Sequence, residues 1–559
     1  MERLRRPESF EDLCSEGLFR ATSVGQILAN WGAIFVPDLP GLLVTGGFRA
    51  GKIPTKQEVL EAGANIFNRT SSVEHVDVFV SHRCGSDSWA KYLAMCLFWN
   101  LPVAVVCSVA AWSLAALVLV AASHGDLPRL SHSPALLPVL VFFPMATFLL
   151  ALFLGHHAVH PCGQPRLWLD RACIHQTDQE LKLRQIHALP VFVARSTSML
   201  VLWDDEYFQR LWCQLELATF AKHGGVRKVA FLPLWLAPWL LSALAMNLTL
   251  VTVIYLQMEV LTTEKLVSLL NAVAPTHFWQ TPLGVSSGAA LGAAVLGLVV
   301  ALAWSSSCKI KLRSHALMLE QMASFDCRGA QCTQEEDRRL VQRQIRELFR
   351  AEATEVMGPE GPEGELKAGH QLTASTVADE DAFSYLPGEP ICMMMDERPL
   401  DAFNVYVQES LRSCVFDAVG GELHVPYGTC LAAAMPLNFY SLVDILNCAN
   451  PECIASYGAE SYADFLWASA IGWLTNVLLV FPIVYPIYLR MLKGTLSIQS
   501  TCLKGVLTVV SGATAHAYLA VCASGTFILL YQARSAFLLV VLALLLQLQY
   551  LFGGGGISG

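Results

Sequence analysis

The sequence predicts an α-helical transmembrane bundle of about seven spans, joined to an α/β domain with a parallel sheet. Two observations lead to this fold class. Only 15% of the 559 residues are charged and 54% are hydrophobic, whereas soluble domains carry about 25% charged residues. Between the long apolar runs lie polar segments in which short strand-like and helix-like patterns alternate, an order typical of a parallel sheet. We therefore expect a multi-pass integral membrane protein whose main partner is the lipid bilayer.

Each predicted span is a window of about 20 mostly apolar residues, because the hydrocarbon core of a bilayer is about 30 Å thick. Two windows form a first hairpin within 101–155, and two more form a second hairpin within 237–304. Three further windows follow within 465–552. In chain order the windows are Leu101–Ser123, Pro134–Gly155, Ala237–Gln257, Leu283–Trp304, Phe465–Leu489, Val506–Tyr531 and Ala536–Phe552.

The soluble blocks between the spans are expected on one face of the membrane, because each hairpin returns the chain to the side it left. Basic residues flank the spans on that face, for example at Lys309, Lys311 and Arg313, and such residues mark the cytoplasmic side. Arg490 and Lys493 conflict with this rule, since strict alternation places them outside unless the C-terminal segment is re-entrant or miscounted. The 17 cysteines are scattered, which favours free thiols in reducing cytosol. The net charge of −9 argues against nucleic acid as a partner.

The soluble sequence divides into an N-terminal segment at 1–75, the α/β pieces at 76–100 and 156–236, and three C-terminal parts. A capping box at Thr55 and Glu58 predicts a helix that runs to about Phe67. The C-terminal parts are a charged helical region at 305–357, a Gly/Pro-rich linker at 358–400 and a small soluble unit at 401–464.

The α/β pieces carry the most specific motif of the chain. Val76–His82 is a predicted buried strand that reads Asp-Val-Phe-Val-Ser from its second residue. Further strands are predicted at Arg166–Asp170, Ser198–Trp203 and Lys228–Leu234, with a helix at Arg210–Lys222. The spacing of strand and helix predicts a doubly wound parallel sheet.

These pieces resemble a TIR domain, the Toll/interleukin receptor and plant-resistance module, with a membrane hairpin inserted after the first helix. The resemblance rests on the opening strand, on Arg83 and Asp87 after it, on Asp170, and on the Trp-Cys-x-x-Glu-Leu run from Trp212 to Leu217. It implies a flavodoxin-like parallel sheet. The glycine that the family places after its second strand is absent and a fifth strand is not obvious, so the end of the fold is truncated or rebuilt from Ser305 onward.

The resemblance also implies a chemistry, because many relatives with this helix motif hydrolyse NAD at the nicotinamide–ribose bond. Glu216 would be the catalytic carboxylate, and Arg83, Trp89, Trp212 and Cys213 would line the substrate site. NAD would then be a substrate, and the sequence indicates neither a bound cofactor nor a metal site. The alternative is that Glu216 is an ordinary helical carboxylate and that Trp212 and Leu217 belong to the core.

Two functional classes follow from these patterns. The first is a membrane-tethered signalling or assembly module that binds other TIR-like domains or itself, with NAD cleavage at Glu216 as a further activity. The second is a channel or transporter in which the TIR-like part is regulatory. Charged residues are scarce within the spans, which argues against transport, whereas prolines and glycines that interrupt them argue for it. His516 is the clearest ionisable side chain inside a span.

Overall fold

The computed structural model describes residues 10–49, 53–131, 133–159, 165–260, 304–332, 335–350, 397–448, 451–456, 459 and 461–553. The chain divides into two compact units, each assembled from three separate stretches. Unit 1 comprises 1–86, 164–231 and 318–414, and unit 2 comprises 87–163, 232–317 and 415–559. Unit 1 is a soluble-type α/β unit, and unit 2 contains the long apolar helices.

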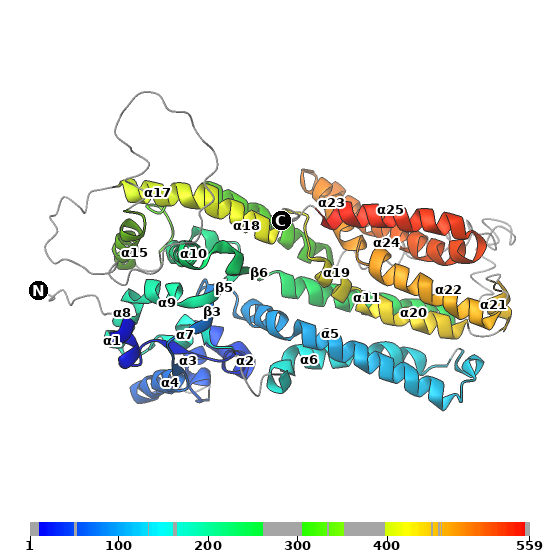
Figure 1. The fold of residues 1–559 in the computed structure, drawn as a ribbon, viewed down its shortest axis with the longest axis horizontal. Helices are drawn as coiled ribbons and strands as arrows, with labels where there is room; N and C mark the ends of the chain where they lie inside the picture. Colours follow the sequence, from blue (N-terminus) through cyan, green and yellow to red (C-terminus); the bar gives the residue numbers. More distant parts are fainter. Residues whose placement is uncertain are drawn as a thin grey trace, which may run out of the picture. The chain divides into compact units, whose positions relative to one another are not determined.

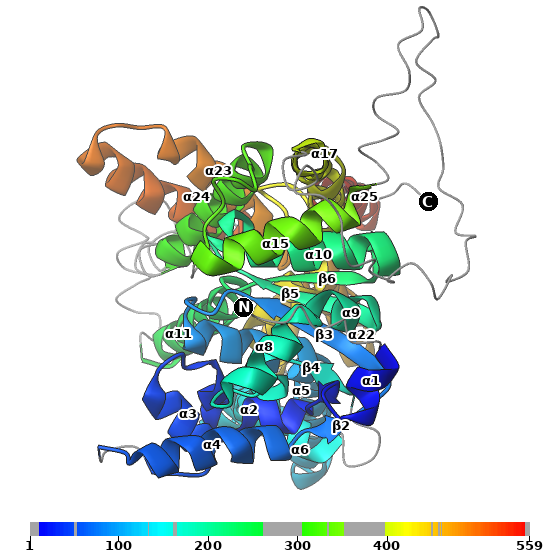
Figure 2. The ribbon, with the colours of Figure 1, turned by 90° about the vertical axis from the view of Figure 1, so that its left-hand side faces the viewer.

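Unit 1 is built around a four-stranded sheet (Figure 2) of β3 (Val76–His82), β4 (Leu167–Trp168), β5 (Ser196–Trp203) and β6 (Val229–Pro233). The strand order is β4-β3-β5-β6, and β3 pairs in parallel with both β4 and β5. If the strands are numbered from β3 in chain order, their spatial order is 2-1-3-4. This order matches the first four positions of the flavodoxin-like doubly wound sheet. The predicted strands and the parallel sheet are confirmed.

The core of the sheet is aromatic. The Phe79 ring of β3 stacks on the Trp168 ring of β4 with 4.5 Å between centroids. Both side chains are buried, as is Trp203 at the end of β5. The β-branched and aromatic residues that predicted the strands therefore fill the interior, where they bury apolar area on both faces of the sheet.

Helices α7 (Asp170–Cys173), α8 (Gln179–His187), α9 (Leu189–Ala194) and α10 (Leu211–Gly224) connect the strands of unit 1. The start of α10 has no side-chain cap. Instead, the Leu211 N–H donates to the Gln331 carbonyl at 3.0 Å and the Gln331 N–H donates to the Gln209 carbonyl at 2.8 Å. Residues that follow the second membrane hairpin thus complete a helix end in the α/β unit. They continue into α15 (Glu335–Leu348), the predicted amphipathic helix, and α17 (Arg398–Tyr406).

The N-terminal segment also belongs to unit 1. Thr22 forms an antiparallel bridge with Leu167 of β4 through two backbone hydrogen bonds of 2.7 and 2.8 Å. The predicted capping box is confirmed at α4, where Thr55 and Glu58 bond each other's backbone N–H groups. The N-terminal elements are α1 (Phe10–Ser15), β1 (Arg20–Ala21), α2 (Val24–Gly32), α3 (Leu39–Thr45), α4 (Lys56–Asn68) and β2 (Ser71–Ser72).

The described residues of unit 2 include six helices that are long and apolar enough to cross a membrane (Figure 1). They coincide with six of the seven predicted windows, which supports a multi-pass membrane protein. The remaining window, Leu283–Trp304, lies outside the described residues except for Trp304. The six are α5 (Ser88–Ala122), η3 and α6 (Pro138–Phe142, Phe143–Val159), α11 (Leu236–Val260), α22 to α23 (Tyr462–Thr475, Val484–Leu496), α24 (Thr501–Gln532) and α25 (Arg534–Phe552).

The segment 401–464, expected to be a small soluble unit, also holds apolar helices. Its second half holds α19 (Tyr427–Ala433) and α20 (Met435–Asn447), which together pass the same test of length and apolarity and are bent by 49°. The bend falls just before Pro436, which cannot donate a backbone hydrogen bond. Unit 1 ends at Cys414, so η7 (Val407–Leu411) belongs to it and α18 (Arg412–Val419) crosses its boundary, and α21 (Pro451–Ser456) follows the pair.

The contacts at the two ends of this helix pair show where the basic residues lie. At one end of the bundle, the Ser131 hydroxyl between α5 and α6 donates to the Asn447 carbonyl at 2.6 Å. At the other end, Lys493 of α23 forms an ion pair with Glu422, which precedes α19, and Lys311 donates to the carbonyl of Glu422. Lys493 and Lys311 therefore lie at the same end. The bent pair that could form a further span precedes Asp464, whereas the sequence placed the uncertainty in topology after it.

Cys448, directly after α20, forms a disulfide. The prediction that the cysteines are free thiols is therefore wrong for this residue. Thirteen other cysteines of the described chain are free. The disulfide lies at the end of the bundle that holds Ser131 and Asn447, opposite to the basic cluster of Lys311 and Lys493.

Candidate functional site

The polar residues of unit 1 converge at the carboxyl ends of the parallel strands. Ser81 and His82 close β3, Asp170 follows β4 and Asp204 follows β5. In open α/β sheets, ligands bind outside the carboxyl ends of the strands, at the point where the strand order reverses. Here that point lies beside β3, because the chain places β4 on one side of β3 and β5 on the other.

Glu216 reaches this edge from α10. Its carboxylate accepts a hydrogen bond of 2.5 Å from the Ser81 hydroxyl, which in turn lies 2.7 Å from the Tyr207 hydroxyl. Tyr207 precedes α10 and is fully buried, whereas Glu216 is partly buried. Three elements therefore fix one carboxyl group: β3, the turn after β5, and α10.

The environment of Glu216 favours its protonated form. Burial raises the pKa of the Glu216 carboxyl to about 8, the hydrogen bond from Ser81 opposes the rise, and the negative charge of Asp170 adds to it. Desolvation disfavours the charged form of an acid. A carboxyl group with a pKa near neutral, placed at a sheet edge, is the kind of group that acid–base or electrostatic catalysis uses.

Asp170 has the opposite character. Burial acts to raise the pKa of its carboxyl, but the charge and hydrogen bond of His82 and the contact with Arg171 hold it well below its usual range. The His82 Nε2 atom lies 3.0 Å from Asp170 Oδ1, and the buried Nδ1 atom of His82 has no hydrogen-bond partner among the described residues. The site thus holds one carboxylate that stays ionised and one carboxyl that is mostly protonated at neutral pH.

Arg83 is engaged by two acidic residues of the loop after β5. Its Nε and Nη2 atoms donate to Asp204 at 2.9 and 2.7 Å, and its Nη1 atom donates to Glu206 at 2.9 Å. The side chains of Arg83 and Asp204 are 18% and 17% exposed. The predicted substrate ligand therefore joins two loops of the site, and its donors face acidic partners of the protein.

The other predicted site residues are distributed differently. Cys213 is buried with its thiol 4.0 Å from the His82 carbonyl, and burial together with the charge of Glu216 raises the pKa of this thiol well above its usual value. The Trp212 indole donates to Asp337 of α15 at 3.4 Å. Trp89 belongs to unit 2, is 59% exposed and packs edge-on against Tyr92. The structure thus brings Glu216, Cys213 and Arg83 to the carboxyl edge of the sheet.

Ser81, Tyr207 and His82 were not among the predicted site residues. Ser81 ends the Asp-Val-Phe-Val-Ser motif, and His82 ends the first strand. Their position after a strand could have marked them, because strand ends meet at one edge of a parallel sheet. The contact between Ser81 and Glu216 spans 135 residues, so the sequence pattern alone could not reveal it.

The space beside Glu216 is small. A recess too narrow to admit a water molecule lies between α9 and α10, lined by Leu189, Pro190, Val193, Leu215, Glu216 and Thr219. Sites for drug-sized ligands and cofactors usually enclose about 300–1,000 Å³. No group of three or more His, Cys, Asp or Glu residues in the described ranges is placed to hold a metal ion. Comparison of the chain with protein-family models, with curated proteins and with solved structures gives no match.

Unit 2 has a polar junction at the bend between α19 and α20. The Asn247 amide of α11 donates to the Ala433 carbonyl at the bend and to the Tyr485 hydroxyl of α23, both at 2.8 Å. A bend frees backbone groups that need new partners in an apolar environment. Asn247 therefore ties three helices together.

His516 in α24 is buried, and its Nδ1 atom lies 2.8 Å from the Gly512 carbonyl of the same helix.

Replacing Asn247 by leucine is expected to lower the stability of unit 2 by about 1 kcal/mol, because the Ala433 carbonyl loses its donor and interhelical hydrogen bonds in membranes are worth about that much. The measurement is thermal unfolding in detergent. Thr249→Val is the matched control, since Thr249 is exposed and bonds only the Ala245 carbonyl of its own helix. Equal melting temperatures for both variants would contradict the assignment.

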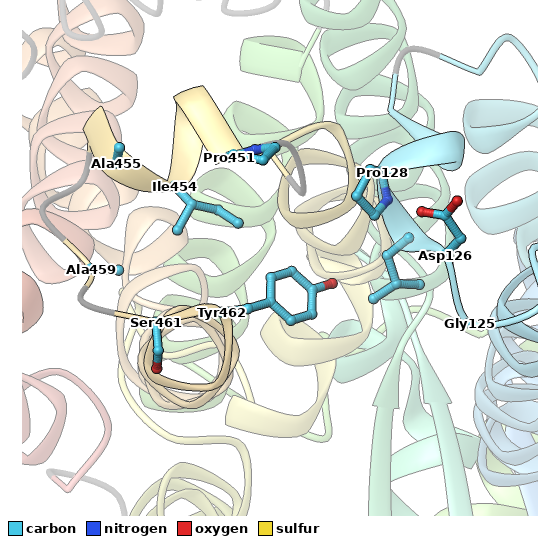
Figure 3. A pocket seen from close by; sticks show the side chains of 10 residues that line it. Gly125, Asp126, Pro128, Pro451, Ile454, Ala455, Ala459, Ser461 and Tyr462 are labelled. Carbon is cyan, nitrogen blue, oxygen red and sulfur yellow. The ribbon is translucent and has the colours of Figure 1, made fainter.

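A second hollow lies at the end of unit 2 that carries the disulfide. It measures about 500 Å³ and is formed by the loop after α5 and by the segment around α21. The Tyr462 side chain extends between Ile454 on one side and Asp126 on the other (Figure 3). Asp126 already forms an ion pair with Arg129 at 2.7 Å. The hollow is open and mainly apolar, and its one acidic side chain is paired.

Proposed function

We propose that the protein is a multi-pass membrane protein whose α/β unit is a TIR-like signalling or assembly module. The strand order 2-1-3-4 and the Trp-Cys-x-x-Glu-Leu helix that delivers Glu216 to the sheet edge support this proposal. The interruption of the module by membrane helices ties it to the bilayer at four points of the chain that precede the linker, namely 86/87, 163/164, 231/232 and 317/318. Its partners are then other TIR-like modules or further copies of itself.

The module faces the cytosol in this proposal. The basic residues Lys311, Arg490 and Lys493 favour a cytosolic location for their end of the bundle, since Lys and Arg near span ends mark that side. The disulfide of Cys448 lies at the opposite end, and disulfides persist in oxidising compartments. These two independent features favour the same orientation.

The activity proposed for the site is cleavage of NAD at its nicotinamide–ribose bond, with Glu216 as the catalytic carboxylate. The single observation that carries it is the hydrogen-bonded Ser81–Glu216 pair at the carboxyl edge of the sheet. Departure of nicotinamide leaves positive charge on the ribose, and the ionised form of Glu216, which a pKa of about 8 makes well populated at pH 8, stabilises that charge. Because the recess beside Glu216 has no room even for a water molecule, binding of a dinucleotide requires Leu189, Pro190 and Val193 of α9 to move away from α10.

Replacing Glu216 by glutamine is expected to reduce nicotinamide release by the purified full chain about 100-fold, the usual loss when one electrostatic stabiliser of a transition state is removed. Release is measured in detergent with NAD at pH 8, with and without a crosslinker that clusters the protein. Glu61→Gln is the control, because Glu61 is an exposed carboxylate of unit 1 that bonds only Gln57.

Equal release by the wild type and the Glu216 variant would contradict the catalytic role. In that case, self-association of the wild type measured under the same conditions would still support the assembly module. A monomeric wild type with no NAD cleavage would count against both parts of the proposal.

A second candidate function is transport or conduction by unit 2, with the α/β unit as regulator. The bent pair α19–α20 and its polar junction at Asn247 favour it, since interrupted helices form substrate sites in transporters. Reconstitution into vesicles followed by ion-flux measurement tests this candidate. A flux that Asn247→Leu abolishes would support it, and the absence of flux for the wild type would contradict it.

A further inference from the structure

The turn that precedes the bent pair is held by basic side chains. It runs from Gly420 to Pro426, between α18 and α19. Lys311 donates to the Glu422 carbonyl, and Lys493 of α23 forms a 2.5 Å ion pair with the Glu422 carboxylate. His315, one helical turn after Lys311, is hydrogen-bonded to the Gly420 backbone. Two separate parts of unit 2 therefore grip one short turn.

The turn is folded tightly against itself. Gly420 adopts a φ of +81°, and a Cβ atom at this position would lie 2.7 Å from the ring of His424. The His424 N–H donates to the Gly421 carbonyl at 2.8 Å. Only glycine allows this close approach of the His424 ring to the backbone. The turn thus places the His424 imidazole in the cluster as a third base, beside Lys311 and His315.

The bases of this cluster are covered by the protein. Lys311 is 0% exposed and His315 is 1% exposed, and within the described part of the chain the Nε2 atom of His315 has no hydrogen-bond partner. A buried cation costs free energy unless it is paired. The only acidic side chain that faces the cluster among the described residues is Glu422, and it is already paired with Lys493.

The surroundings of each base disfavour its protonated form. Burial lowers the pKa of Lys311 to about 7 against the attraction of Glu422 and the nearby thiols Cys308 and Cys430, and the charge of Lys493 adds to the lowering. Burial and the charges of Lys311, His424 and Lys493 lower the pKa of His315 to about 4. Burial and Lys311 also lower the pKa of His424.

The sign of the pH dependence follows directly. A base whose pKa is lowered in the packed state binds fewer protons there than in a solvated state, so acid favours the solvated state. For Lys311 the packed turn loses stability as the pH falls from about 10.5 to about 7. For His315 it loses stability as the pH falls from about 6.5 to about 4. The three bases therefore act in the same direction.

We propose that the turn Gly420–Pro426 is an acid-released latch on the bent helix pair α19–α20. At alkaline and neutral pH the turn packs over Lys311 and His315, and acidification charges the cluster and expels the turn. The turn leads directly into α19, whose far end is the bend held by Asn247 and Tyr485. Release of the turn therefore frees the first half of a membrane helix whose bend is fixed.

The test is hydrogen exchange of the peptide 415–426 in the full chain in detergent between pH 8 and pH 5, corrected for the intrinsic exchange rate at each pH. The protection of this peptide is expected to fall at least about tenfold over this range. His315→Gln combined with His424→Gln is expected to remove most of the fall below pH 6.5. His516→Gln is the control, because His516 is a buried histidine of α24 outside the cluster, and it is expected to keep the wild-type pH dependence.

A second variant keeps the test decisive if the double histidine variant does not fold. Glu422→Gln removes the partner of Lys493 from the rim of the turn, where the Glu422 side chain is 25% exposed. It is expected to release the turn at a higher pH than the wild type. Constant protection of the wild type between pH 8 and pH 5, or an unchanged release pH in Glu422→Gln, would overturn the latch.

Discussion

Replacing Arg83 by alanine is expected to lower the free energy of unfolding of the α/β unit by about 2–3 kcal/mol, because it leaves Asp204 without its cationic partner in a half-buried position. The guanidinium donates two hydrogen bonds to Asp204 and one to Glu206. The loops after β3 and β5 would then lose the contact that holds the carboxyl edge of the sheet together. Hydrogen exchange of peptides from β3 and β5 measures this local free energy.

The contact of Arg83 with Asp204 and Glu206 is called the clamp. Two further variants distinguish this structural role of Arg83 from a role in substrate binding. Arg83→Lys keeps the charge but cannot form the bidentate pair, so we expect about half of the loss. Adding Asp204→Asn to Arg83→Ala removes the unpaired carboxylate and is expected to recover part of the stability. If Arg83→Ala lowers NAD affinity without any change in the exchange of β3 and β5, the guanidinium is a substrate ligand and the clamp is refuted.

Raising the pH from 5 to 8 is expected to destabilise the α/β unit through Glu216. The pKa of this carboxyl rises from its ordinary value of 4.5 to about 8 in the folded protein. Between these values the folded state holds a proton that the unfolded state releases, so stability is full below 4.5 and is lost as the pH approaches 8. The loss of stability is at most about 1.4 kcal/mol per pH unit. Partial exposure of the carboxyl reduces this loss to about 1 kcal/mol per pH unit.

Glu216→Gln isolates this effect from all other titrations. Glutamine cannot ionise, so the difference in stability between the variant and the wild type should grow steadily from pH 5 to pH 8. The measurement is unfolding in urea, monitored by the hydrogen exchange of peptides from β3 and α10. A pH-independent difference would mean that Glu216 ionises at its ordinary pKa and that its surroundings are well solvated.

The strands and most spans could be read from local patterns. Val76–His82 was predicted with its observed bounds, because a β-branched and aromatic run of seven residues has few alternatives. The long apolar windows likewise coincide with long helices. The same pattern did not predict a span at Tyr427–Asn447. Pro436 and the polar residues Asn438 and Asp444 interrupt its apolar run, and a bend divides it into two short helices.

The candidate site was predictable only in part. The helix motif singled out Glu216, but its partner Ser81 lies 135 residues away, and the Tyr207 hydroxyl that contacts Ser81 lies 126 residues from Ser81. Arg83 was correctly placed after the first strand, yet its partners Asp204 and Glu206 lie in a loop more than 120 residues further along the chain. Local patterns identify the residue types, and the parallel order of the strands decides which of them meet.

The sequence by itself determined that long apolar helices alternate with the pieces of a parallel α/β sheet, because hydrophobic length and periodicity are local properties. Only the tertiary structure decided that the distant segment after the second hairpin completes α10 at Gln331, that α19 and α20 add a crossing candidate, and that Lys311 and His315 grip the turn before it. These features arise where groups far apart in the chain satisfy each other's hydrogen bonds and charges. Burial makes such pairing obligatory, and the fold determines which partners are within reach.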